Sequence, residues 1–503
     1  MLALLVGLYF LVLTVLCTYG VHRAHLVLLC LKHRRRFEAA ESPALAQALP
    51  RVTIQLPLYN EATVVARLIE ATGRIDYPAD LLEIQVLDDS TDETRELAQQ
   101  GVAELRRRGI DAAYVRRPTR EGFKAGALEY GLRTAKGELV AIFDADFVPQ
   151  PEFLRAVVGH FVDPRVGMVQ TRWAHMNRGY NVLTSVQALM LDGHHLIENR
   201  ARFAGGYMFN FSGTGGIWRR RAIEESGGWQ HDTLTEDLDL SYRAQLAGWK
   251  FIYRPDVLTP SELPEDLSAF RAQQFRWAKG TVQTARKLLG RVLRAPVTTS
   301  QRVEAVFHMT PHFAYPLILL LSVLMLPALL MLPASEAHTM LLIDLPLCIG
   351  STGSLATFYV LAEVSQGRSA WSALVRLPAV IALGAGLAPN QTRAVFEGMS
   401  SRTGEFVRTP KRGSMLGRYR QRAQLPWSEM ALTIVCFLTS VTSLQTGHLF
   451  ATPFAVLFTA GYAYVAVLVL LEQAQRRREA AAAGERPSGE TEAVAEASLP
   501  RAA

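Results

Sequence analysis

Long apolar runs alternate with polar segments along this chain. The runs cover residues 1–31, 313–332, 340–362, 430–444 and 452–471. Most of them approach the roughly 20 residues that a helix needs to cross the hydrocarbon core of a bilayer. No basic residue precedes the first run, which is longer than the apolar region of a cleavable signal peptide. The pattern therefore predicts five membrane-spanning helices, and the first, with its basic flank, forms an anchor over residues 1–36.

A sixth apolar stretch, residues 374–387, fits a membrane span less well. It covers only ~14 residues and begins near Arg376, so we expect it to lie in the membrane interface or to re-enter the bilayer. If it crossed, the basic loop over residues 393–422 would be forced to the opposite side. The remaining division of the chain is into a hairpin over 309–362, an interfacial segment with a basic loop over 373–422, a hairpin over 428–472 and a tail over 473–503.

Basic residues gather beside the apolar runs, at 32–36, 393–422 and 476–478. Clusters in these places mark the cytoplasmic side of a membrane protein, so the net charge of +7 does not indicate a nucleic-acid partner. We expect a multi-pass integral protein of the cell (inner) membrane, with its polar middle domain in the cytoplasm. The tail is poor in large apolar residues, and we expect it to be disordered.

The four cysteines also lie in or beside the apolar runs, and their spacing matches no metal site. The sequence therefore predicts neither a disulfide framework nor a zinc centre.

Short β-rich segments alternate with helical patterns in the polar middle of the chain. The segments cover residues 52–58, 83–87, 112–115 and 138–144. This alternation predicts an α/β fold, with a parallel-rich sheet that binds a nucleotide, inserted between the transmembrane helices over residues 51–289. Ligands of such sheets bind at the carboxyl ends of the strands.

Acidic residues occur at two of these strand ends. Asp88 and Asp89 close the second segment, and Asp144 and Asp146 close the fourth. Two carboxylates at a strand end can hold Mg²⁺ or Mn²⁺ against a diphosphate, because these cations prefer oxygen ligands. The Asp-x-Asp pattern is also common in surface turns. Its place after a strongly apolar strand favours a metal site, since buried carboxylates without a partner are costly.

Two further polar clusters follow later in the domain. Glu236 and Asp237 precede a helical pattern over 238–246, where a simple helix cap by Thr235 is the alternative interpretation. Arg276 and Trp277 lie on an amphipathic segment over 267–289. An arginine can bind a diphosphate and a tryptophan can stack on a sugar, although both residues also suit a position beside the bilayer.

These clusters in this order, followed by membrane spans, resemble the processive family 2 glycosyltransferases. The set comprises the two aspartates at 88–89, the Asp-Ala-Asp at 144–146, the Thr-Glu-Asp at 235–237 and the Gln-x-x-Arg-Trp at 273–277. The surrounding segments LPLYNE from Leu56 and GFKAGAL from Gly122 are similar to those of cellulose-synthase-like mannan and glucomannan synthases. The resemblance covers most of residues 52–411.

The resemblance implies a GT-A-type domain and an inverting, metal-dependent hexosyltransferase. The expected substrates are a nucleotide sugar, either GDP-mannose or UDP-glucose, and a growing β-1,4-linked polysaccharide. Asp237 would be the general base, and Asp144 and Asp146 would hold Mn²⁺ or Mg²⁺. The residues implied for the donor are Asp88, Asp89, Lys124, Asp144, Asp146, Gln273 and Arg276; those for the acceptor are Trp277, Phe211, Ser212, Gly213 and Glu236; those for a gating loop are Phe406, Thr409 and Lys411.

Two alternatives remain open from the residues alone. A non-processive enzyme could use the same chemistry to glycosylate a membrane lipid such as ceramide. A transporter or receptor could carry a domain that only binds nucleotide. The number of spans after the domain and the gating-like segment favour a polymer, because a polysaccharide needs a polar route through the bilayer. The mostly apolar spans argue against a transporter, and the sequence does not predict an export partner.

Overall fold

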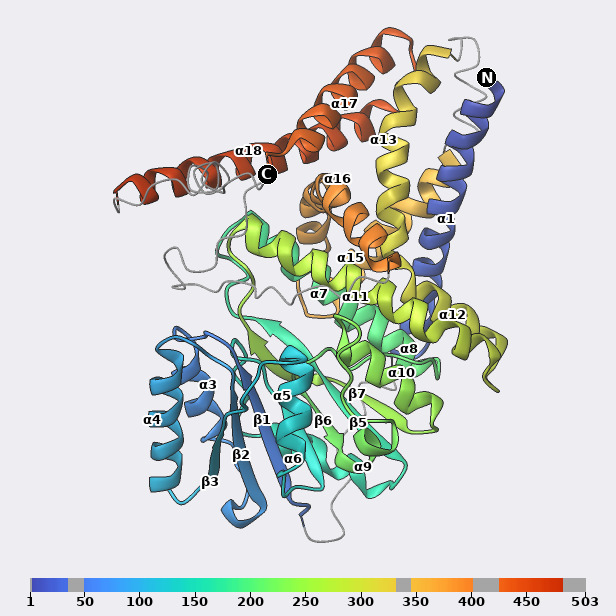
Figure 1. The fold of residues 1–503 in the computed structure, drawn as a ribbon. Coiled ribbons are helices and arrows are strands. Elements are labelled where there is room, and N and C mark those ends of the chain that lie inside the picture. The colour runs from blue at the N-terminus through green and yellow to red at the C-terminus, as the bar shows by residue number, and fades with distance from the viewer. Residues whose placement is uncertain (1, 35–48, 332–344, 401–424, 483–503) are drawn as a thin grey trace, which may run out of the picture.

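The structure is a computed structural model that describes residues 2–34, 49–331, 345–400 and 425–482. An α/β domain forms one part of it, and long apolar helices gather at one end of this domain (Figure 1). The segment predicted as a gating loop, with Phe406, Thr409 and Lys411, lies outside the described residues, and so does the tail from residue 483.

A seven-stranded sheet organises the domain. Its strand order is β3-β2-β1-β4-β6-β5-β7, and every neighbouring pair is parallel except the two that involve β6. The prediction of a parallel-rich α/β sheet is confirmed. The strands are β1 (Val52–Leu58), β2 (Leu82–Asp88), β3 (Asp111–Val115), β4 (Leu139–Ile142), β5 (Val166–His175), β6 (Gly216–Arg219) and β7 (Lys250–Ser261).

Both faces of the sheet are covered, which is why its strands read as nearly continuous apolar runs. Ile54 and Leu56 of β1 pack into an apolar cluster on one face, whereas Val140 and Ile142 of β4 pack into a second cluster on the other. The covering helices are α3 (Val65–Thr72), α4 (Thr94–Arg107), α5 (Phe123–Leu132), α6 (Phe153–Val157), α7 (Val182–Gly193), α8 (Arg200–Ala204), α9 (Arg220–Glu225) and α10 (Glu236–Leu246).

Two helices run along the side of the domain that faces the apolar helices (Figure 1). They are α11 (Leu267–Arg294) and α12 (Thr299–Met309). The Asp266 carboxylate caps α11 by accepting a hydrogen bond from the Ala269 N–H at 2.7 Å, and Thr298 caps α12 in a capping box with Gln301. Both caps fix where the chain turns along the base of the apolar helices.

Six described helices are long and apolar enough to cross a membrane, and the chain is an integral membrane protein. α1 (Leu2–Lys32) and α13 (Ala314–Met331) match predicted spans, as do α17 (Trp427–Gln445) and α18 (Thr452–Ala482). α15 (Ser354–Val364) also matches one, because it continues the helical residues from Leu345 that include the π-helix η6 (Ile349–Gly353). α18 extends well beyond the predicted end at 472, so the first residues of the expected disordered tail are helical. The sixth helix is α16 (Ala370–Met399).

α16 corrects the predicted extent of the sixth stretch, because it is a continuous helix of 30 residues that contains two prolines. Its beginning and its end both contact the domain. Ala373 belongs to the same apolar cluster as Leu183 of α7, and the Glu397 carboxylate lies 3.0 Å from the Lys279 ammonium of α11. The helix lies between α11 and the other apolar helices (Figure 1). Its interfacial placement stays a prediction.

Candidate active site

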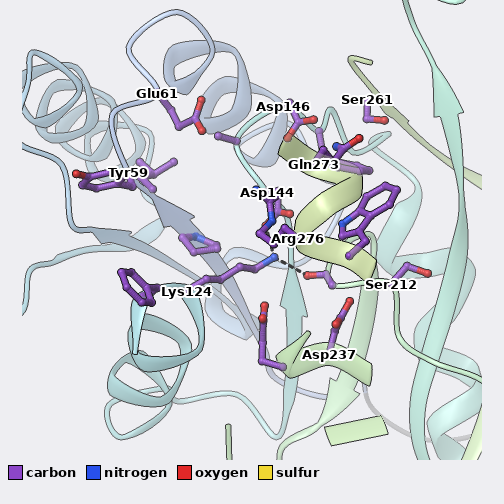
Figure 2. A pocket seen from close by; sticks show the side chains of 18 of the residues that line it. Tyr59, Glu61, Lys124, Asp144, Asp146, Ser212, Asp237, Ser261, Gln273 and Arg276 are labelled. Carbon is purple, nitrogen blue, oxygen red and sulfur yellow. Dashed lines mark hydrogen bonds and ion pairs between the residues drawn. The ribbon is translucent and has the colours of Figure 1, made fainter. Parts of the chain in front are cut away.

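A cavity opens where the carboxyl ends of β1 and β4 meet the beginning of α10 and the N-terminal half of α11 (Figure 2). Parallel strands place their carboxyl ends at one edge of the sheet, so residues distant in the sequence converge there. The predicted site residues that line this cavity are Asp89, Lys124, Asp144, Asp146, Ser212, Gly213, Glu236, Asp237, Gln273, Arg276 and Trp277.

Of the predicted site residues that the structure describes, Asp88 and Phe211 do not line the cavity. Asp88 is 1% exposed and accepts hydrogen bonds from the Tyr114 hydroxyl at 2.6 Å and from the Ser90 N–H at 2.9 Å. It therefore shapes the turn that presents Asp89. Phe211 is fully buried in the core against Trp218, because its side chain points away from the cavity that Ser212 lines.

Lys124 places a positive charge in the middle of the acidic groups. Its Nζ lies 2.5 Å from Asp144 Oδ1 and donates a hydrogen bond to the Gly213 carbonyl at 2.9 Å. Figure 2 shows the side chain reaching across the cavity toward Asp144. Burial favours the neutral amine, but the carboxylates of Asp144 and Glu236 outweigh it and raise the pKa of Lys124. The ammonium therefore stays charged where an anionic ligand would bind.

Asp144 and Asp146 are the residues predicted to hold a divalent cation. No group of three or more His, Cys, Asp or Glu side chains converges as a metal site in the described part of the chain. The two carboxylates line the cavity two residues apart, and Asp144 already faces the Lys124 ammonium. The chemistry of this pair fits Mg²⁺ or Mn²⁺, and such an ion would take its remaining oxygen ligands from a diphosphate and water.

Asp237 lies in the first turn of α10, where its Oδ1 accepts a hydrogen bond from the Leu238 N–H at 2.8 Å. Its other oxygen faces Gly213, whose φ of +81° favours glycine and where a Cβ would lie 3.0 Å from Asp237 Oδ2. Thr235 does not cap the helix, because its hydroxyl pairs with that of Thr284 at 3.1 Å. The alternative of a simple Thr235 cap therefore fails.

The charge state of Asp237 is set by its surroundings. Burial, together with the nearby Glu236 carboxylate, raises the pKa of Asp237 to about 7. A carboxylate whose pKa is close to the working pH is suited to accept a proton.

The sequence model of the glycosyltransferase-like family 2 matches residues 50–280, the segment that carries this cavity. These residues form a family 2 glycosyltransferase domain. The match confirms the resemblance inferred from the motifs.

Curated plant proteins resemble the same part of the chain. This chain is 44% identical over 251 residues to a probable glucomannan 4-β-mannosyltransferase 7 of Oryza sativa. The alignment covers 49% of this chain and 43% of the rice protein. The chain is 41% identical over 251 residues to the glucomannan 4-β-mannosyltransferase 7 of Arabidopsis thaliana, covering 49% and 45%. The chain thus matches less than half the length of these relatives.

One solved structure shows the same fold. The mannosyltransferase PcManGT of Pyrobaculum calidifontis, in complex with GDP-Man and Mn²⁺, has a TM-score of 0.50 and 24% sequence identity. The similarity covers 70% of this chain and 97% of the archaeal protein. It supports the predicted GT-A-type fold.

Aromatic residues of the glycosyltransferase site were missed by the sequence analysis. The Arg120 guanidinium lies over the Tyr59 ring, with Cζ 3.4 Å from the ring centroid, and 4.9 Å from the centroid of Phe123. All three line the cavity near Asp89, which Arg117 binds through two hydrogen bonds of 2.8 and 2.6 Å. Tyr59 and Phe123 belong to the segments LPLYNE and GFKAGAL. These segments supported the family resemblance, but no role was predicted for the two aromatic residues within them.

The transfer rate is expected to depend on pH through Asp237. Only the ionised carboxylate accepts a proton, so kcat/KM should rise about tenfold per pH unit below pH 7 and level off above it. Replacing Glu236 with glutamine removes a neighbouring charge that raises this pKa, and should move the acidic limb to lower pH. A pH–rate profile of both proteins measures the shift. If the acidic limb of the pH–rate profile did not move in Glu236→Gln, its assignment to Asp237 would be contradicted.

Proposed function

We propose that this protein is an inverting, metal-dependent mannosyltransferase that extends a β-1,4-linked glycan from GDP-mannose at the cytoplasmic side of the cell membrane. The observation that carries the proposal is the convergence of Asp237, the Asp144–Asp146 pair and the cations Lys124 and Arg276 on one cavity of a family 2 domain. The names of the plant relatives support mannosyl transfer. The GDP-Man and Mn²⁺ in the archaeal complex support the donor and the ion.

In the proposed reaction, Asp237 acts on the acceptor, whereas Lys124 and Arg276 act on the donor. Asp237 accepts the proton of the acceptor hydroxyl as that oxygen forms a bond to C1 of the donor sugar, and the C1–O bond to the diphosphate breaks. Lys124 and Arg276 stabilise the charge that develops on the departing diphosphate. A single displacement of this kind inverts the configuration at C1 and needs one base on the acceptor side. The contribution of a divalent ion held by Asp144 and Asp146 is to neutralise the leaving group.

A second cavity, with a volume of about 380 Å³, adjoins the active site on the side of the apolar helices. Its polar lining supports the proposal that the acceptor is a glycan. Its wall carries Glu198 and Arg202, which lie 3.3 Å apart between Oε2 and Nη1. Charged groups in a buried wall require polar partners. Sugar hydroxyls provide such partners, whereas the acyl chains of a lipid acceptor do not.

Labelled donors distinguish the candidate reactions. Membranes that contain the protein are incubated with labelled GDP-mannose or with labelled UDP-glucose, the second donor that the motifs allow, and the products are digested with mannanase or β-1,4-glucanase. We expect ethanol-insoluble label from GDP-mannose that mannanase releases, and none from membranes with the Asp237→Asn variant. Label that appears only in a chloroform-soluble lipid would establish the lipid acceptor instead.

Trp277 is expected to determine polymer formation, because its indole lines both cavities and can stack on an acceptor sugar. Stacking needs an aromatic face but no charge. Trp277→Phe should therefore retain some polymer, whereas Trp277→Ala should abolish it. Size analysis of the product measures the difference, and Trp371→Ala, at a 69% exposed position on α16, is the control. Full-length polymer from Trp277→Ala would contradict the assignment.

A further inference from the structure

The two cavities join at a shared set of side chains. Trp173 of β5 belongs to this set together with Ser212, Asp237 and Trp277, and each of them lines both cavities. An acceptor that presents its terminal hydroxyl to Asp237 must pass this junction if the rest of its chain occupies the second cavity. Trp173 is therefore placed beside the acceptor, although no motif in the sequence pointed to it.

The indole of Trp173 is fixed from three directions. Its Nε1–H donates a hydrogen bond to the Thr214 carbonyl at 3.4 Å, in the loop that carries Ser212 and Gly213. Its ring packs edge-on against Phe147, the residue after Asp146, with 5.2 Å between ring centroids. The His195 ring lies 5.2 Å away on another side. An aromatic ring held in this way is a preorganised surface for one sugar, because no side-chain freedom is lost when the sugar binds.

Glu198 supplies a polar group farther from the reacting centre. It lies on the π-helix η3 (His194–Asn199) and lines the second cavity but not the first. Its Oε2 faces His194 Nδ1 at 2.9 Å and Arg202 Nη1 at 3.3 Å. Among the described residues, no group binds its Oε1. Burial opposes ionisation, but Arg202 and His194 lower the pKa of Glu198 well below its usual range, so the carboxylate is charged.

The network around Glu198 explains why this carboxylate keeps its position. Arg202 also donates a hydrogen bond from Nε to Glu304 Oε1 at 2.8 Å, and Glu304 Oε2 lies 2.7 Å from His22 Nε2 of α1. The first apolar helix is thereby tied to the wall of the cavity. An ionised oxygen held in a rigid wall is a strong acceptor for a hydroxyl group.

We propose that Trp173 and Glu198 form an acceptor-binding subsite for neutral hexose units that follow the terminal sugar of the glycan, with Trp173 stacking on one unit and Glu198 accepting a hydroxyl hydrogen bond from a unit beyond it. This inference rests on the proposed function, because it assumes a glycan acceptor. Since Glu198 does not line the active-site cavity, it contacts only acceptors that are longer than their terminal unit. The subsite therefore affects elongation more than the first transfer.

The test uses the full-length protein in detergent or membranes with labelled GDP-mannose. Loss of a hydrogen bond to a charged group is expected to lower the elongation rate about tenfold in Glu198→Gln, with a shorter product. Trp173→Ala should shorten the product further, and Trp173→Phe should restore part of its length. The KM for GDP-mannose and the transition temperature should stay close to the wild-type values. Glu224→Gln, at an exposed surface pair with Arg220, is the matched control for the charge change.

Each result of this experiment has a definite meaning. Wild-type product length in both Trp173→Ala and Glu198→Gln would overturn the subsite while leaving the mannosyltransferase intact. Equal losses in donor KM, rate and transition temperature, without rescue by Trp173→Phe, would also overturn it, because they indicate a purely structural role. A wild-type protein that transfers no hexose to a glycan would overturn the proposed function itself.

Discussion

Replacing Asp237 with asparagine is expected to lower hexose transfer by roughly 10²–10⁴-fold, the range that is typical of a lost general base. Asparagine keeps the size of the side chain and an oxygen that can accept the Leu238 N–H, but it cannot take up the proton of the acceptor hydroxyl. The KM for the donor should change little, because the diphosphate is expected to face Lys124 and Arg276. Steady-state kinetics with varied donor and acceptor separate these effects.

The stability of Asp237→Asn is also expected to differ from that of an ordinary buried-charge variant. The folded protein raises the pKa of Asp237 to about 7, so the folded state binds the proton more tightly than the unfolded state. Ionisation above that pKa therefore destabilises the fold, and removal of the charge relieves this cost. The transition temperature should be unchanged or higher at alkaline pH.

Asp239→Asn is the matched comparison, two residues farther along α10. Asp239 is fully buried and its carboxylate lies 2.7 Å from Arg243 and 2.9 Å from Lys287. Loss of these ion pairs leaves the buried Arg243 guanidinium without its carboxylate partner, while Lys287 keeps its ion pair with Asp232 at 2.7 Å. This variant should therefore lose stability together with activity. If Asp237→Asn behaved like Asp239→Asn, with a lower transition temperature and weaker donor binding, Asp237 would be structural and the base would have to be sought elsewhere.

The parts of the site that the sequence predicted are those fixed by regular strands. β1, β2 and β4 are short apolar runs, and their parallel pairing places Asp89, Asp144 and Asp146 at one edge whatever the details of the loops. Local patterns therefore sufficed there. Local patterns also singled out Asp237 and Trp277, but only the family resemblance favoured a functional role for them, because a helix cap and an interfacial tryptophan produce the same local pattern.

The parts that the sequence did not predict depend on contacts between distant segments. Trp173 lies in β5, where an aromatic residue indicates strand propensity and not a site. Only the fold shows that Trp173 packs beside His195 of η3 and lines the same cavities as Trp277 of α11. Phe211 was predicted as a site residue together with its neighbours, but its ring packs against Trp218 in the core. The sixth stretch was predicted to be short because its apolar run covers only ~14 residues and begins near Arg376. The helix α16 is longer, contains two prolines and packs against α11 and α18.

Replacing Asp146 with asparagine is expected to abolish measurable turnover without unfolding the protein. Metal-ion stabilisation of a leaving diphosphate amounts to several kcal/mol, so the loss should be about 10³-fold or more. The fold should tolerate the change, since Asp146 lies at the cavity and not in either apolar cluster of the sheet. Transfer assays with Mn²⁺, with Mg²⁺ and after EDTA treatment, together with thermal unfolding, measure both effects.

Measurements of Mn²⁺ affinity test directly whether Asp146 is a metal ligand. If Asp144 and Asp146 hold the ion together with the donor diphosphate, GDP should increase the affinity of the wild-type protein for Mn²⁺, because the nucleotide completes the coordination. Asp146→Asn should lose this increase, while Asp163→Asn, at a surface turn paired with Arg165, should keep it. Mn²⁺ titration followed by electron paramagnetic resonance measures the affinities. Activity that survives EDTA, or an Asp146→Asn protein with wild-type Mn²⁺ affinity, would show that the cation Lys124 beside Asp144 stabilises the leaving group without a metal.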